Sequence, residues 1–187
     1  MAKGRKPKDS GAEQLSFETL KPEKKTQGAK QFRFEESLAL FQYLLSLFDR
    51  ASLSKLCEGM KGENKEGWDA QNISHFCHEL GNQLLPFPGV TKDDLLRYDQ
   101  NITRHTMAVS SRRGTFRWKY FQYMALLFTE IYLDQYFNNP KGLLENLNQQ
   151  LDKMNVGRTE KDKIDSYNTE DLNKIAFWQA TGSGKTL

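Results

Sequence analysis

The sequence has few of the features that mark a secreted or membrane protein. It contains two cysteines among 187 residues, too few for the disulfide framework of a small secreted domain. No apolar run approaches the ~18 uncharged residues that a membrane span needs. No apolar core follows the basic N-terminus, as it would in a signal peptide. We therefore expect a cytoplasmic protein without a membrane partner.

Excess charge is also scarce, and it is confined to one end. The formal net charge is +3, and residues 1–30 carry eight Lys and Arg against four Asp and Glu, so the remainder is near neutral. A near-neutral body gives no overall argument for nucleic-acid binding. The polar composition of residues 1–33 predicts a flexible basic tail. This tail is either a solvated extension or a weak phosphate-contacting arm.

Aromatic residues, by contrast, make up 12% of the chain, which is too many for a wholly disordered protein. Between residues 34 and 156, apolar side chains recur at helical spacing. The predicted fold class is therefore mainly α, with a bundle of about six helices over 34–156. A charged connector over 157–173 follows, with room for one helical turn. We expect the helices to begin near Phe34, Ser52, Ile73, Thr91, Phe116 and Pro140.

Several helix ends are predicted by single residues. Ser52 and Thr91 are expected N-caps, and Thr91 forms a capping pair with Asp94 three residues later. Gly114 is expected to end the fourth helix after a basic last turn. Pro140 is suited to the first position of the sixth helix.

The periodicity changes near the end of the chain. Residues 174–179 (KIAFWQ) predict a short buried strand, which leads directly into a loop with the signature of a phosphate-binding loop. Lys185 would contact the β- and γ-phosphates of ATP, and the Thr186 hydroxyl would contact Mg²⁺. Glycines in such a loop let backbone N–H groups approach phosphate oxygens. The alternative is a glycine loop that matches by coincidence. The predicted ATP-binding residues are Ala180, Thr181, Gly182, Ser183, Gly184, Lys185 and Thr186.

Residues 179–186 (QATGSGKT) resemble motif I of superfamily-two helicases and translocases. The general phosphate-loop pattern has glycine where this chain has Gln179, which argues against the kinase or small-GTPase form. The closest similarity is to the DEAD/DEAH-box-like motors of type I and type III restriction subunits. This resemblance covers about the last dozen residues. It implies a two-lobed RecA-like motor that hydrolyses ATP while moving on nucleic acid, with Lys185 and Thr186 as its catalytic residues.

Other parts of such a motor do not occur in the sequence. The chain has no acidic pair after the loop, no arginine finger and no second lobe. It therefore reads as the N-terminal region of a larger DNA-acting helicase or translocase of a restriction or defence system, with partner subunits. Residues 174–187 would begin an incomplete RecA-like α/β domain. We expect this region alone to have no ATPase activity and negligible ATP affinity. The alternative is a helical protein-interaction or regulatory module attached to a P-loop ATPase of another kind.

Basic and aromatic residues alternate around residue 116, a pattern that can track a nucleic-acid strand. The aromatic residues also keep a helical period, so a basic helix end beside core aromatics is the alternative. Two arginines on the outer face of the preceding helix would extend such a surface. The candidate nucleic-acid contacts are Arg97, Arg104, Arg112, Arg113, Arg117 and Lys119.

Cysteines and histidines gather between residues 57 and 78. A zinc site using Cys57, His75, Cys77 and His78 lacks a Cys-x-x-Cys pair. Cys77 falls on an apolar helix face and the histidines fall off it, so a buried cysteine with surface histidines is the better account. His105 is expected to be a hydrogen-bonded packing residue.

Overall fold

The computed structural model describes residues 34–83, 87–114 and 116–177. Within these residues, most α-helices begin at a residue whose side chain caps the helix. The predicted tail and residues 178–187 lie outside this range. Four short 3₁₀ turns accompany the α-helices: η1 (Phe34–Ser37), η2 (Glu58–Met60), η3 (Glu63–Lys65) and η4 (Asp171–Asn173). The α-helices are α1 (Ala39–Ser46), α2 (Leu53–Leu56), α3 (His75–Gly81), α4 (Lys92–Arg113), α5 (Tyr120–Asn138) and α6 (Pro140–Asn155).

The helix ends confirm the predicted caps. The Ser52 hydroxyl accepts a hydrogen bond from the backbone N–H of Lys55. Thr91 and Asp94 form a reciprocal capping box at the start of α4, and Pro140 occupies the first turn of α6. Gly114 follows α4 with φ of 89°, a conformation that favours glycine. These ends depend on local chemistry, so the sequence alone was enough to place them.

The predicted start of the fifth helix was wrong by one turn. Residues Phe116–Lys119 are not helical, and α5 begins at Tyr120. The indole N–H of Trp118 donates to the Thr106 hydroxyl of α4 at 2.6 Å. The backbone N–H of Lys119 donates to the Gln122 side chain. Trp118 is thus tied to α4 before α5 starts, which the apolar periodicity could not reveal.

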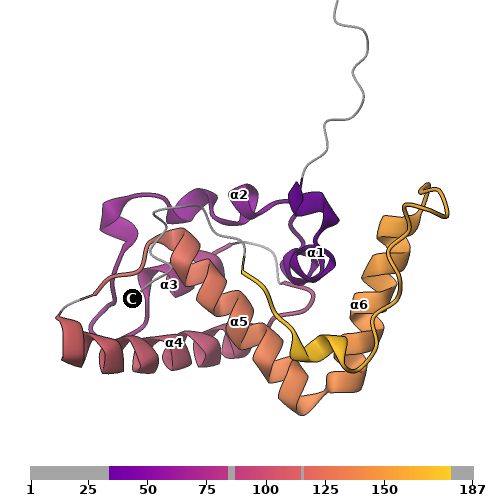
Figure 1. Cartoon of the computed structure of the whole chain (residues 1–187). Helices are drawn as coiled ribbons and strands as arrows, with labels where there is room; N and C mark the ends of the chain where they lie inside the picture. The colour runs from indigo at the N-terminus through magenta and orange to yellow at the C-terminus, as the bar shows by residue number, and fades with distance from the viewer. Residues whose placement is uncertain (1–33, 84–86, 115, 178–187) are drawn as a thin grey trace, which may run out of the picture. The chain divides into compact units, whose positions relative to one another are not determined.

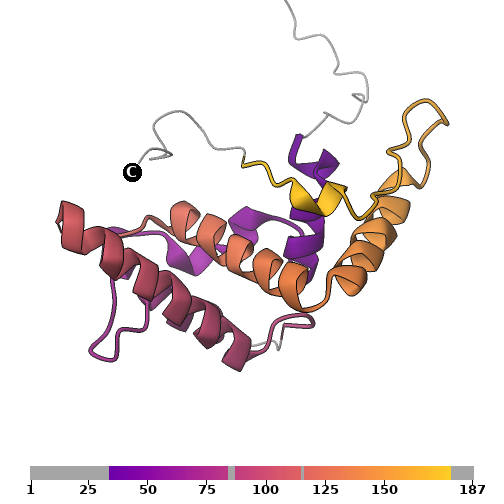
Figure 2. The ribbon, with the colours of Figure 1, turned by 60° about the horizontal axis from the view of Figure 1, so that its bottom comes forward.

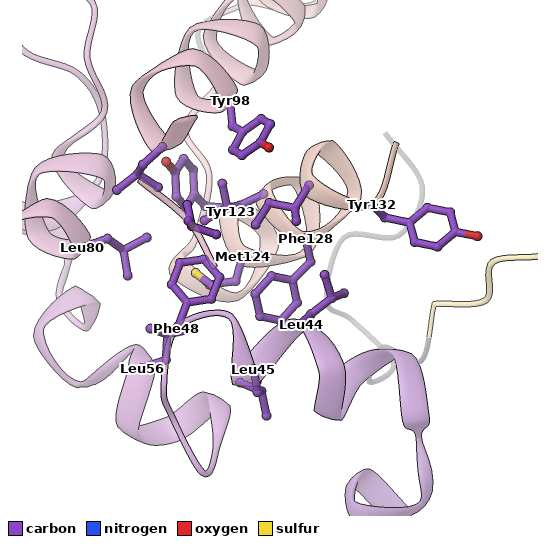
Figure 3. Packing of buried hydrophobic residues seen from close by; sticks show 14 of the residues in the cluster. Leu44, Leu45, Phe48, Leu56, Leu80, Tyr98, Tyr123, Met124, Phe128 and Tyr132 are labelled. Atoms are coloured by element: carbon purple, nitrogen blue, oxygen red, sulfur yellow. The ribbon is translucent and has the colours of Figure 1, made fainter. Parts of the chain in front are cut away.

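Helix α5 is the centre of the bundle. Figures 1 and 2 show it between α4 and α6, and it contacts both, while α1 contacts α6 and α3 contacts α4. The apolar core follows from this arrangement. In Figure 3, Phe48 lies near Met124 and Phe128 of α5, and the Phe48 and Phe128 ring centroids are 6.0 Å apart. Of the core side chains, Phe48, Met124 and Leu127 are fully buried.

The described residues form no β-strand, and their single β-bridge joins Trp68 to Ser74. The buried strand predicted over 174–179 is therefore not confirmed for its described part. Residues 174–177 pair with no described segment, and Ile175 and Phe177 are 40% and 52% exposed. Residues 178 and 179 lie outside the described range. No described helix has both the length and the apolar composition to cross a membrane.

Candidate functional site

The predicted nucleotide-binding residues 180–186 lie outside the described part of the chain. What the structure does describe is the segment that leads to them. Leu172 is buried at 4% exposure, and the exposed residues Lys174–Phe177 follow it. The proposed ATP-binding loop can therefore be discussed only from its residue types. Most of the predicted nucleic-acid contacts, by contrast, lie in the described part of the chain.

Arg97 forms an ion pair between two helices. Its guanidinium bonds Asp94 at 2.8 Å and Asp134 of α5 at 3.0 Å. The Tyr98 hydroxyl also donates to Asp134, at 2.7 Å. The pKa of Asp134 is lowered chiefly by the hydrogen bonds from Arg97. Arg97 therefore links α4 to α5, and two carboxylates already pair with its guanidinium.

Lys119 is paired in the same way. Its ammonium lies 2.7 Å from a carboxylate oxygen of Glu66, and this contact raises the pKa of Lys119. An exposed pair of this kind adds little stability. It nevertheless places a negative charge beside the cation, which weakens Lys119 as a phosphate contact.

Three exposed arginines remain without such a partner. Among the described residues, neither Arg104, Arg112 nor Arg117 forms an ion pair, although Arg104 donates to the Asn101 side chain at 3.2 Å. Residues 100–129 contain five Lys and Arg and no acidic residue. We call Arg104, Arg112 and Arg117 the basic surface. Arg113 belongs to the last turn of α4, but its side chain lies outside the description.

The aromatic side chains next to this surface already pack against each other or against the core. Phe116 and Trp118 meet edge to face with ring centroids 4.5 Å apart, and both are half-buried. Trp118 also packs against the core and is hydrogen-bonded to Thr106. The basic surface is therefore suited to phosphate contacts more than to base stacking.

The cysteines behave as buried core residues. Cys57 and Cys77 are free and buried, and burial raises their thiol pKa values to about 11 and about 12. His78 is exposed and bonds Asp69 at 2.7 Å. Within the described residues, no group of three or more Cys, His, Asp or Glu could hold a metal ion. His105 is exposed, so its predicted packing role was wrong.

We expect both thiols to be unreactive in the folded chain. With pKa values near 11 and 12, fewer than about one thiol in a thousand is ionised at pH 8, and thiolate is the reactive form. A disulfide reagent such as Ellman's reagent should find no thiol within minutes in buffer and two per chain in guanidinium. Rapid modification of either cysteine in buffer would contradict this burial.

A buried polar cluster was missed by the sequence analysis. Asp99 of α4 is fully buried and accepts hydrogen bonds from the Ser74 backbone N–H, the Ser74 hydroxyl and the Tyr123 hydroxyl. It thus joins α3, α4 and α5. The signal was its position four residues after Leu95 and three before Ile102, on the apolar stripe of α4. Burial, and after it the proximity of Asp99, holds the pKa of Tyr123 well above its usual value.

Acid should weaken the link between α4 and α5. In the folded chain, the pKa values of Asp94 and Asp134 lie below the ordinary value of 3.8. The two ionised carboxylates therefore stabilise the fold fully above about pH 3.8, and this stabilisation is lost as the pH falls through their lowered pKa values. We expect Asp134→Asn to lower stability at pH 6 and to flatten its decline between pH 5 and pH 2. Urea unfolding measures this, with exposed Asp152→Asn as control. An unchanged decline in Asp134→Asn would contradict the assignment.

In comparisons with known proteins, no family model, curated protein or solved structure matches the chain.

Proposed function

We propose that the chain is the N-terminal region of an ATP-dependent helicase or translocase that acts on DNA in a bacterial restriction or defence system in the cytoplasm. The observation that carries this is the sequence QATGSGKT at residues 179–186, directly after the apolar residues Ile175–Trp178. In such a motor Lys185 would bind the ATP phosphates and Thr186 would bind Mg²⁺.

The segment before the loop is apolar in sequence, as the first strand of a parallel sheet would be. In the structure, Ile175 and Phe177 are nevertheless 40% and 52% exposed, and residues 174–177 form no strand with the described chain. The proposal therefore rests on the residue types alone. The helical bundle would then brace the motor or contact DNA through the basic surface.

A protein-interaction module on another kind of P-loop ATPase is the second candidate. It is favoured by apolar exposure at the end of α5, where Phe137 is 74% and Leu133 is 38% exposed. These two residues border a surface depression of about 220 Å³ that Arg97 and Asp134 also line. Salt-insensitive binding to a protein would favour this function, whereas DNA binding that falls with salt would favour the first.

The coding sequence after codon 187 tests the proposal without any assumption about the bundle. We expect a helix to follow Thr186 at once, and an Asp-Glu pair to follow further on, because Mg²⁺ and the attacking water need acidic partners. Further helicase motifs should follow. A stop codon soon after codon 187, or the motifs of another P-loop class, would overturn the proposed motor.

A further inference from the structure

The connector after α6 is packed along the bundle. Gly157, with φ of 79°, lies just after α6, and the chain returns beside that helix toward α5 (Figures 1 and 2). We call residues 158–173 the strap. The sequence predicted only a charged connector with room for one helical turn, because the contacts that hold the strap come from residues of α5 and α6 that lie 9 to 40 residues away.

Two asparagines of α6 hold the backbone of the strap. The Asn155 side chain donates to the Ile164 carbonyl and accepts from the Ile164 N–H, both at 2.9 Å. Asn148 makes the same pair of bonds with Tyr167, at 3.0 and 2.8 Å. The two asparagines are seven residues apart and share one face of α6. Each side-chain amide thus pairs with the strap as a neighbouring strand would.

The end of the strap is anchored on α5. Leu172 is 4% exposed and belongs to the apolar core, and its carbonyl accepts the Tyr132 hydroxyl at 2.6 Å. The Tyr136 hydroxyl donates to the Asn173 side chain, also at 2.6 Å. Burial of one leucine and these bonds fix the last strap residues to the same helix that forms the centre of the core.

We propose that the strap is a positioning element that fixes where the nucleotide-motif segment leaves the bundle. Six residues, 174–179, separate Asn173 from Ala180, and a chain of that length spans at most about 25 Å. In the proposed motor, the strap would hold the start of this segment within that distance of α5. This role rests on the proposed function, whereas the docking of the strap does not.

Amide hydrogen exchange by NMR on the 187-residue chain, without nucleotide, tests the docking. We expect the Ile164 and Tyr167 amides to be protected, because both are bonded to asparagine side chains. Leu172→Ala should speed their exchange by about 30-fold or more, since loss of a buried leucine side chain favours local opening. Met124 and Leu127 in α5 should keep their slow exchange.

Backbone ¹⁵N relaxation tests the positioning itself. Order parameters at Lys174 and Ile175 should be high in the unaltered chain and fall below about 0.6 in Leu172→Ala, while Leu172→Met restores them. Leu56→Ala is the matched control, because Leu56 is also buried in the core, at 0% exposure, but lies in α2. It should speed exchange across the bundle and leave these order parameters unchanged.

Unprotected Ile164 and Tyr167 amides in the unaltered chain would overturn the proposal. So would order parameters at Lys174 and Ile175 that do not respond to Leu172→Ala. Neither measurement uses ATP or DNA, so failure of the proposed motor function would be seen separately, in the coding sequence and in ATP turnover.

Discussion

Replacing Asp99 by alanine is expected to lower the free energy of unfolding by about 3 kcal/mol or more. The substitution leaves three buried donors without an acceptor: the Ser74 N–H, the Ser74 hydroxyl and the Tyr123 hydroxyl. Each unsatisfied buried group costs about 1–3 kcal/mol. Because these donors come from α3 and α5, the loss should also loosen the contact of α4 with both helices.

Two variants separate this network from a general effect of substitution. Tyr123→Phe removes one of the three bonds and should cost about 1 kcal/mol. Asp152→Ala, on the exposed side of α6, should change stability by no more than about 0.5 kcal/mol. Urea unfolding followed by circular dichroism gives all three values. A loss below about 1 kcal/mol in Asp99→Ala would show that the cluster does not hold the helices together.

Reversing the charges of the basic surface is expected to abolish most of the proposed DNA binding. The triple variant Arg104→Glu, Arg112→Glu and Arg117→Glu should weaken binding to duplex DNA at least about tenfold. It should also reduce the salt dependence of log K by about one for each phosphate contact removed. The reason is that Arg104, Arg112 and Arg117 are exposed in a stretch without acidic residues. Fluorescence anisotropy across a salt series gives both quantities.

The matched control moves the same amount of charge elsewhere. Lys141→Glu, Lys153→Glu and Lys161→Glu change the net charge equally at three exposed positions on α6 and in the strap. This control should retain most of the affinity, because it leaves the arginines of the basic surface in place. Attraction that depended on net charge alone would weaken both triple variants equally. Equal weakening in both triple variants would remove the basic surface as the binding face.

Local signals account for the parts of the fold that were predicted well. The Thr91–Asp94 capping box and Gly114 mark the two ends of α4 as predicted, because helix caps depend on residues within one turn. The burial of Cys77 also followed from its helix face. In each case, neighbours along the chain supplied the physical cause.

The contacts that the sequence pattern could not predict are nonlocal. Arg97 was predicted to face nucleic acid, whereas Asp134, 37 residues away, pairs with it. Lys119 is paired with Glu66 across 53 residues. Asn148 and Tyr132 have no periodicity that signals a strap partner. Only the tertiary packing of the helices and the strap brings these groups together.

ATP turnover by the product of the complete reading frame tests the motor assignment most directly. We predict hydrolysis that DNA stimulates, and a loss of at least about a hundredfold in Lys185→Ala, because this lysine would stabilise charge on the transferred phosphate. Lys141→Ala, an exposed lysine of α6, should keep full activity. Turnover that is unchanged in Lys185→Ala, or no turnover with any nucleic acid, would contradict the account.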